Sequence, residues 1–418
     1  MTKKNVRIAL AAMLLLPSIA AANGLNLNGL GTRAQAMGGA YVGIADDFSA
    51  VFWNPAGAAG FTRRTFGFFA TDLIPTATYR QELVDAKTQT SHYLGFLAGY
   101  YHPVSSKVVV GVGFSTPSGM GTMWSGADFL ALTGGTLYDW SSKVGVLSIS
   151  PMVAVKLGPA ISLGATINVN YGSFALMQPG GTADLGEATV DLGQYDENMN
   201  GWGFGATFGV LVKPVDKLSV GLTVRTPSTV SFKGLANLSN MTLYGLPGSS
   251  NLERKITWPL WIAGGVSFRP TGRLLLSADV HWTQWSTLDS ITTDYLNAAW
   301  AGLAAIDGKD ERVLDWADAL QVRFGAEYML DATTALRAGY YNDPAPGPES
   351  TLNVLLPTHT FNAFSVGIGK TIGDVQLDFG LEYLAGVDRT TTYGPPDAMP
   401  GDYGSKIVVP TVSVSTRF

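Results

Sequence analysis

Cysteine is absent from the 418 residues of this chain, and charged residues make up only 14% of it. Without cysteine the chain cannot be held together by disulfides. Soluble domains carry about 25% charged residues, so the low charge disfavours a surface that faces water throughout. No segment contains about 20 consecutive apolar residues, which excludes a helix that spans a bilayer.

Signals for catalysis and for nucleic-acid binding are also absent. A phosphate-binding loop, a dinucleotide fingerprint and a Gly-x-Ser-x-Gly elbow are all missing. The formal net charge of −5 leaves no basic footprint for nucleic acid. We therefore expect no enzyme, no cofactor, no metal and no nucleic-acid partner. The four histidines, on separate segments without metal-site spacing, are His92, His102, His281 and His359.

The N-terminus has the layout of a secretory signal peptide. Lys3, Lys4 and Arg7 precede a short apolar run at 8–16, and alanines at 20–22 offer a cleavage site. We therefore predict a signal peptide at 1–22 and an exported chain; a retained N-terminal helix is the alternative. Loss of the three basic residues takes the net charge from −5 to −8.

In place of these features the sequence has alternation. Between 375 and 383, every second residue is apolar and the residues between are polar or glycine, so a strand here has one apolar face. The same pattern recurs at 163–171, 218–225, 274–283 and 320–330. An exported chain with this pattern is either a secreted β-sandwich or a transmembrane β-barrel.

The lengths of the connections distinguish these two classes. Links such as 103–106, 158–160, 270–272 and 373–374 are short, whereas 119–141, 289–317 and 388–404 are long. Short turns at one end and long loops at the other are typical of bacterial outer-membrane barrels. The pattern predicts fourteen antiparallel strands, at 63–74, 91–102, 106–118, 142–157, 161–176, 199–213, 217–233, 254–269, 273–288, 318–330, 334–342, 359–372, 375–387 and 405–418.

The last residues favour a barrel that closes on itself. The chain ends in an alternating segment with a terminal aromatic, Phe418, which resembles the C-terminal signal of outer-membrane barrels; an ordinary edge strand is the alternative. Because lipid leaves no backbone polar group unpaired, the first and last strands should pair. We predict an all-β transmembrane antiparallel β-barrel at 63–418 in the bacterial outer membrane, with both termini periplasmic. Tryptophans available for its aromatic belts are Trp202, Trp258, Trp282 and Trp285.

Residues 23–62 precede the first predicted strand and lack alternation. They are too apolar to face the periplasm, with Leu25, Leu27 and Trp53 among their side chains. A barrel of this size leaves a lumen, because about 8 strands already fill with side chains and about 16–18 leave a channel. We therefore predict that this segment is a plug, or hatch, inside the barrel, with a turn at Asn54-Pro55.

The hatch segment resembles a known family. Its features are Gly29-Leu30-Gly31, Met37-Gly38-Gly39-Ala40, Ala45-Asp46-Asp47 and, most specifically, Asn54-Pro55-Ala56. They are similar to the N-terminal hatch of the FadL/TodX family of outer-membrane transporters for long-chain fatty acids and aromatic hydrocarbons. Residues 200–234 resemble the central hairpin of that family. The resemblance implies a fourteen-stranded barrel and a hatch motif of Leu25, Leu27, Asn54, Pro55 and Ala56.

The resemblance also implies a passive route for hydrophobic molecules. A ligand is captured at the cell surface, passes to a pocket inside the barrel, and leaves through a lateral opening at a kinked third strand when the hatch N-terminus moves. In this chain Pro117 and Gly119 interrupt the third strand, since Pro cannot donate to the ladder and Gly marks bulges. The alternative is that Pro117 only ends the strand at the outer rim.

Three lumen arginines are candidate ligand contacts. A carboxylate is best met by Arg or Lys, and alternation places Arg225, Arg323 and Arg337 on lumen faces, with Arg225 in mid-strand. The alternative is a charge network with the interior acids Asp279, Glu327, Asp378 and Glu382. Two apolar loops, 128–140 and 293–306, could form short helices that either make a surface capture groove or cover the barrel mouth.

The leading functional hypothesis is passive uptake of hydrophobic compounds, with fatty acid or hydrocarbon left open. A general porin for small polar solutes is the runner-up, although an open porin needs no apolar plug. A surface adhesin and an outer-membrane hydrolase are weaker alternatives. Expected partners are the hydrophobic ligand, outer-membrane lipids and the barrel assembly machinery, and we expect a monomer.

Overall fold

A computed structural model describes residues 24–184, 189–395 and 398–418, and the predicted signal peptide at 1–22 lies outside this range. Most of the described chain after the hatch belongs to one antiparallel sheet. Its long strands are β1 (Thr65–Gln81), β3 (Tyr93–Pro103), β4 (Val108–Trp124), β5 (Trp140–Lys156), β6 (Ile161–Pro179), β9 (Gln194–Val215), β10 (Leu218–Arg225), β11 (Ser228–Leu238), β12 (Ser249–Trp258), β13 (Trp261–Phe268), β14 (Leu274–Thr283), β15 (Ser290–Tyr295), β17 (Ala319–Met329), β18 (Thr334–Asp343), β19 (Phe361–Ile372), β20 (Val375–Gly386) and β22 (Gly401–Arg417).

Within the described residues these segments make fourteen crossings of a closed barrel. β10 and β11 form one crossing because both pair with β9. β12 and β13 form the next crossing because they pair with β11 and β10, and β14 and β15 form the one after it because they pair with β13 and β12. The short β16 (Glu311–Val313) extends β17 along β15. β1 pairs with β22 from Thr65↔Arg417 to Arg80↔Asp402, so the sheet closes on itself. The predicted fourteen-stranded antiparallel barrel is confirmed.

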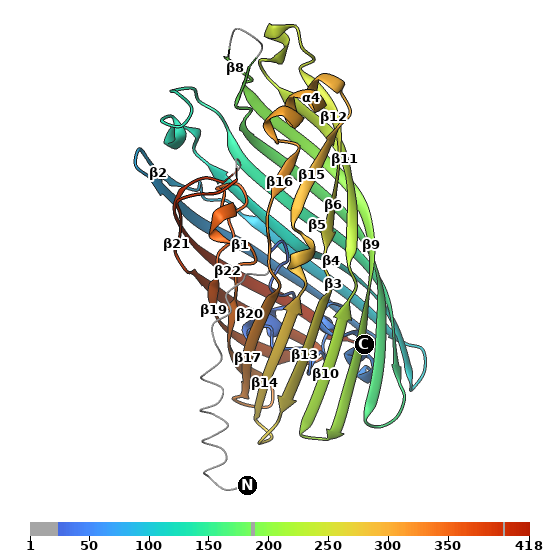
Figure 1. Cartoon of the computed structure of the whole chain (residues 1–418). Coiled ribbons are helices and arrows are strands. Elements are labelled where there is room, and N and C mark those ends of the chain that lie inside the picture. The colour runs from blue at the N-terminus through green and yellow to red at the C-terminus, as the bar shows by residue number, and fades with distance from the viewer. Residues whose placement is uncertain (1–23, 185–188, 396–397) are drawn as a thin grey trace.

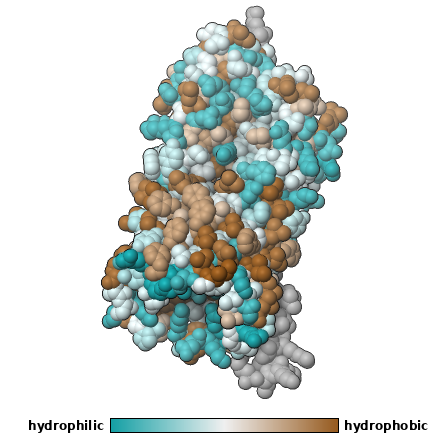
Figure 2. Space-filling model, turned by 180° about the vertical axis from the view of Figure 1, so that it is seen from behind, coloured by the Kyte–Doolittle hydropathy of each residue, from teal (hydrophilic) through white to brown (hydrophobic). Residues whose placement is uncertain are grey.

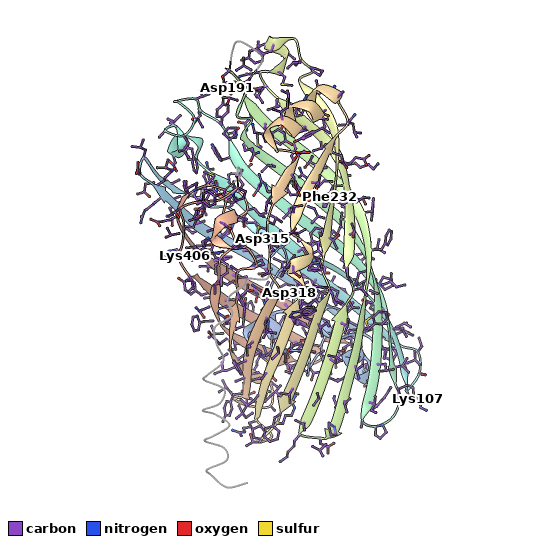
Figure 3. The ribbon with its side chains drawn as sticks, viewed as in Figure 1. Lys107, Asp191, Phe232, Asp315, Asp318 and Lys406 are labelled. Atoms are coloured by element: carbon purple, nitrogen blue, oxygen red, sulfur yellow. The ribbon has the colours of Figure 1, made fainter. Side chains whose placement is uncertain are left out.

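The two ends of the barrel differ in their connections (Figure 1). At the lower end of the figure, turns of two to five residues join the strands. Figure 3 places Lys107 at one of these turns and Asp191 at the opposite end. The C-terminus also lies at the short-turn end, because Arg417 N donates to Asp374 O at 3.3 Å.

The long-loop end carries the remaining small elements. The second apolar loop forms the helix α4 (Ala298–Asp307), as predicted, whereas the first forms only η2 (Gly126–Phe129) and turns. Among the described residues no helix is long and apolar enough to cross a membrane. The other elements here are β2 (Val84–Lys87), β7 (Thr182–Asp184), β8 (Thr189–Asp191), η3 (Met241–Tyr244), η5 (Glu349–Thr351) and β21 (Arg389–Thr391), whereas η4 (Trp285–Thr287) lies between β14 and β15 within their crossing.

Alternation gives the barrel an apolar outer face. Large apolar side chains at every second position of β19 and β20 are exposed, including Phe364, Val366, Phe379 and Leu381. Figure 2 shows hydrophobic residues gathered across the lower middle of the visible face, with mostly hydrophilic residues above and below them. This band is the surface that a bilayer would cover.

The strands differ from the predicted ones in two respects. β1, β4 and β9 extend further toward the long loops than the predicted segments. The predicted strands 217–233 and 254–269 are each broken, at Thr226-Pro227 and at Pro259-Leu260, because Pro has no N–H to donate. Arg225 therefore ends β10 and does not lie in mid-strand. The predicted belt role is wrong for Trp258 and Trp285, which face inward and are buried.

The described residues before β1, 24–64, contain the predicted hatch (23–62) except its first residue, and they are folded inside the barrel; they are called the hatch below. It contains α2 (Thr32–Ala36), α3 (Ala50–Trp53) and the 3₁₀ helix η1 (Pro55–Gly60). α2 contacts β18, β19, β20 and β22, whereas η1 contacts β4, β5, β6 and β9 across the lumen. Trp53 is only 1% exposed, and its Nε1 donates to Leu30 O at 2.8 Å. The hatch thus spans the barrel from wall to wall.

Candidate functional site

The Asn54-Pro55-Ala56 motif joins α3 to η1 and fixes both to the wall. Asn54 Oδ1 accepts a hydrogen bond of 3.1 Å from Ala56 N and so caps η1. Its Nδ2 donates to Val42 O and Val210 O at 3.0 Å each. Pro55 occupies the first helical position, where no N–H is needed. One fully buried side chain therefore ties a hatch turn, an earlier hatch segment and β9 together.

Lumen-facing glycines let the hatch backbone lie directly on the strands. A Cβ at Gly164 would lie 2.3 Å from the backbone of η1, and one at Gly339 would lie 1.9 Å from Gly38 N. A Cβ at Gly209 would lie 2.1 Å from Asn54 Oδ1. Real side chains do not approach other atoms this closely, so the docked position of the hatch requires glycine at these three wall positions.

Buried ion pairs fasten the hatch to β17. Arg33 donates to Asp46 within the hatch at 2.5 Å and to Glu327 of β17 at 2.7 Å. Arg337 of β18 donates to the same Glu327 at 2.8 Å and to Asp378 of β20 at 2.6 Å. Burial alone would raise the pKa of Asp46, but the adjacent Arg33 guanidinium lowers it below its usual value. Acidic and basic side chains therefore alternate in one chain of ion pairs that runs from Asp46 and Arg33 of the hatch to side chains of β17, β18 and β20.

Two further wall residues hold the backbone of the hatch. Asp279 of β14 accepts from the N–H groups of Tyr41 and Val42 at 2.8 Å each. Arg323 of β17 donates to the carbonyls of Asn28 and Gly38 at 3.0 Å and 3.1 Å. All these hydrogen bonds go to backbone groups of the hatch, so the two wall side chains fix the position of its main chain.

The predicted arginines differ in their surroundings. Arg323 and Arg337 are almost completely buried, and neither lines any of the three cavities described below. Their ligand role stays a prediction without support from the geometry. The ion pairs of Arg337 with Glu327 and Asp378 agree with the alternative interpretation, a charge network inside the barrel.

Arg225 has a different environment. Its guanidinium carbon lies 4.8 Å from the ring centroids of both Phe52 and Trp261, and Nη2 donates to Phe52 O at 3.0 Å. No carboxylate of the described residues forms an ion pair with it. Arg225 also lines a cavity of about 60 Å³ together with serines and asparagines of β5 and β6. A cation in this position can accept an anionic or strongly polar group.

The third crossing, β4, is irregular at Pro117. Its pairing with β3 ends at Leu97↔Ser115, although β4 continues to Trp124. Its register against β5 shifts between Ser115 and Ser118. The strand therefore does not end at Pro117, and its far half has no continuous ladder on the β3 side.

The N-terminal end of the hatch lies against this irregularity. Leu27 N donates to Pro117 O at 3.1 Å, and Ser118 Oγ donates to Asn26 Oδ1 at 3.1 Å. Asn26 and Ser118 form an isolated antiparallel bridge. A Cβ at Gly119 would meet nothing closer than a carbonyl at 4.0 Å, so the space beside the break is open.

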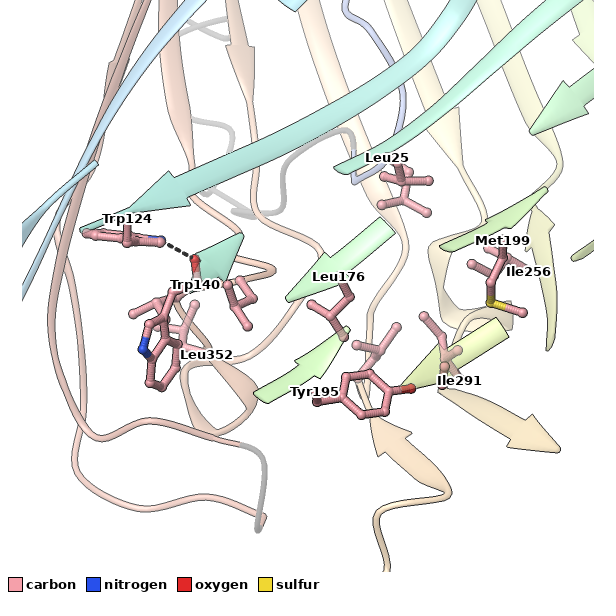
Figure 4. Close-up of a cluster of buried hydrophobic side chains, with 14 of the residues drawn as sticks. Leu25, Trp124, Trp140, Leu176, Tyr195, Met199, Ile256, Ile291 and Leu352 are labelled. Carbon is pink, nitrogen blue, oxygen red and sulfur yellow. Dashed lines mark hydrogen bonds between the residues drawn. The ribbon is translucent and has the colours of Figure 1, made fainter. Parts of the chain in front are cut away.

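An apolar chamber of about 310 Å³ lies on the long-loop side of the hatch. Leu25 of the hatch lines it, together with side chains of β5, β6, β9, β12 and α4. Figure 4 shows part of the surrounding cluster, with Leu25, Leu176, Tyr195 and Ile256. α4 contributes Trp300, so the second apolar loop forms a wall of the chamber. A largely apolar enclosure with a few polar groups is the usual form of a small-molecule site.

The charged residues of the described chain that line this chamber are all cationic. Among the described residues no acidic side chain lines it, whereas four cations do. Arg254 binds the fully buried Glu197 through two hydrogen bonds of 2.7 Å and 3.0 Å, and it also donates to Thr293. The four cations are Lys143, Arg254, Lys309 and Arg312.

Residues 24–28 of the hatch separate three cavities. Leu25 lines the apolar chamber, and Asn26 lines the small cavity beside Arg225. Asn26 and Leu27 also line a third cavity, of about 140 Å³, between the hatch and the wall formed by β1, β3, β4, β19, β20 and β22. These five residues therefore lie between all three spaces.

Comparisons with known proteins agree with this geometry. Residues 13–418 match the model of a family described as outer membrane protein transport protein (OMPP1/FadL/TodX). The chain is 23% identical to the long-chain fatty acid transport protein of Escherichia coli K12 over 94% of both chains. In fold it is similar to the crystal structure of a Pseudomonas aeruginosa FadL homologue, with a TM-score of 0.78, 16% identity and coverage of 94% of this chain and 100% of that one. The toluene transporter TodX of P. putida gives a TM-score of 0.75, 16% identity and coverage of 94% and 99%.

Proposed function

Because this chain belongs to the OMPP1/FadL/TodX family of outer-membrane transport proteins, we propose that it takes up long-chain fatty acids or hydrocarbons passively. The observation that carries this proposal is the apolar chamber of about 310 Å³, which the hatch closes at one end. The relatives described as long-chain fatty acid transport proteins and as toluene transporters support both ligand classes.

The proposed route has three stages. The ligand enters the chamber from the long-loop side, which we place at the cell surface, with the short turns and both termini in the periplasm. Displacement of residues 24–28 then opens the chamber toward the small cavity at Arg225 and toward β4. The ligand leaves sideways through the interrupted ladder at Pro117 and Gly119, which the bridge between Asn26 and Ser118 now covers. We propose that the protein acts as a monomer in contact with outer-membrane lipids, after insertion by the barrel assembly machinery.

Within this function the charge of the chamber favours a fatty acid. Four cations and no acidic side chain among the described residues line it, so the charged groups of the lining attract a carboxylate, although Arg254 is already paired with Glu197. Arg225, stacked between two rings and without an ion-pair partner in the described chain, would receive the head group next.

Uptake and permeability together distinguish this function from a general porin. We expect cells of a Gram-negative host that lack their own transporter to take up a long-chain fatty acid when they express this chain. Liposomes that contain the purified protein should not swell in isotonic sugar, because the hatch fills the lumen. Sugar-driven swelling, or fatty-acid uptake no faster than in cells without the protein, would contradict the proposal.

Arg225→Ala tests the head-group contact. Loss of a hydrogen bond to a charged group should weaken fatty-acid binding at least about tenfold. Toluene binding to the purified variant should change much less, because toluene has no carboxylate. Equilibrium binding of both ligands measures this, with Arg80→Ala as a control at an exposed arginine of β1. Equal losses for the two ligands would show that Arg225 acts only by supporting the hatch.

A further inference from the structure

The third cavity, of about 140 Å³, has a lining unlike that of the apolar chamber. Its apolar part comes from the wall, with Leu73, Leu384 and Ile407. Its titratable lining residues are acids and a histidine, Asp343, Glu382 and His359, together with Tyr93, and no Lys or Arg of the described residues lines it. The two spaces therefore have opposite preferences for charge, and an anion that the chamber attracts is repelled here.

Two buried side chains that line this cavity each carry one polar atom without a hydrogen-bond partner among the described residues. His359 is 2% exposed and its Nε2 is unpartnered, and Gln35 is 6% exposed with an unpartnered Oε1. Burial lowers the pKa of His359 to about 4, so its imidazole is neutral at pH 7. A buried polar atom without a partner is unfavourable, and a ligand that forms a hydrogen bond with it removes this cost.

Both unpartnered atoms are acceptors. His359 Nδ1 lies 3.4 Å from Val387 O, and because a carbonyl only accepts, the proton of the neutral ring belongs on Nδ1. Nε2 then carries a lone pair. The Oε1 of Gln35 also accepts only. A molecule that satisfies either atom must donate a hydrogen bond.

From this geometry we infer that the third cavity is a binding site for a small uncharged molecule that donates a hydrogen bond, of the size and chemistry of a phenol. A cavity of about 150 Å³ lined by apolar side chains holds one benzene ring. The carboxyl groups of Asp343 and Glu382 disfavour an anion, and a plain hydrocarbon leaves both acceptors unsatisfied.

The position of this site links it to the proposed route. Tyr93, Gly119 and Gly121 line it, and these residues flank the interrupted ladder between β3 and β4. The role of this site in the route rests on the proposed uptake function. The preference of the site for an uncharged hydrogen-bond donor does not depend on that function. An uncharged hydroxyl compound would bind here beside the proposed lateral exit.

Crystals of the mature protein soaked with three brominated rings test this inference. We expect anomalous density for 4-bromophenol between His359 and Ile407, weaker density for bromobenzene, and none for 4-bromobenzoate at this place. Equal occupancy for bromobenzene, or no 4-bromophenol in the cavity, would overturn the inference. Neither result affects the expected uptake of fatty acids by cells, so the two proposals fail separately.

Variants add a measurement in solution. Equilibrium dialysis of 4-bromophenol against His359→Phe should show affinity lowered roughly threefold to tenfold, the effect of one hydrogen bond, with bromobenzene unchanged. His102→Phe on β3 is the matched control and should behave as the unaltered protein. If His359→Phe does not fold, Gln35→Leu removes the second acceptor and should give a loss of similar size. Unchanged 4-bromophenol affinity in the folded variants would contradict the assignment.

Discussion

Replacement of Glu327 by Ala should release the hatch while the barrel stays folded. Glu327 accepts from Arg33 of the hatch at 2.7 Å and from Arg337 of the wall at 2.8 Å. Removal of one partner from a buried ion pair destabilises a structure by about 3–5 kcal/mol, because the remaining charge is left uncompensated. Here two guanidinium groups lose their shared carboxylate, but Arg33 keeps Asp46 and Arg337 keeps Asp378, so we expect a loss toward the lower end of this range. The wall loses one side-chain pair, between Glu327 and Arg337, but it keeps its backbone ladders, so the barrel stays closed while the docking of the hatch is weakened.

Limited trypsin digestion measures this release. Arg33 is largely buried, and we expect cleavage after it in Glu327→Ala but not in the unaltered protein. The barrel should still migrate on gels as a folded, heat-modifiable species. Glu253→Ala is the matched control, since Glu253 pairs with Lys233 in an exposed position. Equal protection of Arg33 in Glu327→Ala and in the control would show that the network does not hold the hatch.

The barrel could be predicted from the sequence because membrane burial leaves a regular signal. Each crossing must present an apolar outer face, and each short turn needs residues that reverse the chain. Within the described residues the apolar outer face repeats in all fourteen crossings and the short turn at six connections, and both can be read locally. The breaks at Pro227 and Pro259 were missed because the flanking residues keep the alternation on both sides of each proline.

The candidate site could be predicted only in part. Asn54, Pro55 and Ala56 were found through the resemblance, and the structure supplies the physical reason for the motif in the three hydrogen bonds of Asn54. Alternation placed Arg323 and Arg337 inside the barrel. It could not separate hatch contacts from ligand contacts, because both require the same lumen face.

Other residues of the site carry no local signal. Asn26 is one polar residue in an irregular segment, and its role comes from a bridge to Ser118, 92 positions later in the chain. Gln35 and His359 meet in one cavity although they lie far apart in the sequence. Such contacts depend on how the hatch is seated in the barrel, which no alternation pattern encodes.

A disulfide between positions 26 and 118 should stop uptake. Residues opposite each other in antiparallel pairs have Cα atoms about 4.5–5.5 Å apart, within the range that a disulfide bridges. Asn26→Cys with Ser118→Cys would therefore tether the N-terminal end of the hatch to β4 at the interrupted ladder. The chain has no cysteine of its own, so no other disulfide can form.

Fatty-acid uptake by cells that express this double variant, under oxidising and then reducing conditions, tests most directly whether residues 24–28 control passage. The control is Thr229→Cys with Thr257→Cys, an exposed facing pair on β11 and β12. We expect uptake through the oxidised 26–118 variant to fall to the level of cells without the protein and to return on reduction, while the control is unaffected throughout. Equal uptake by the oxidised and reduced 26–118 variant would contradict gating by the hatch.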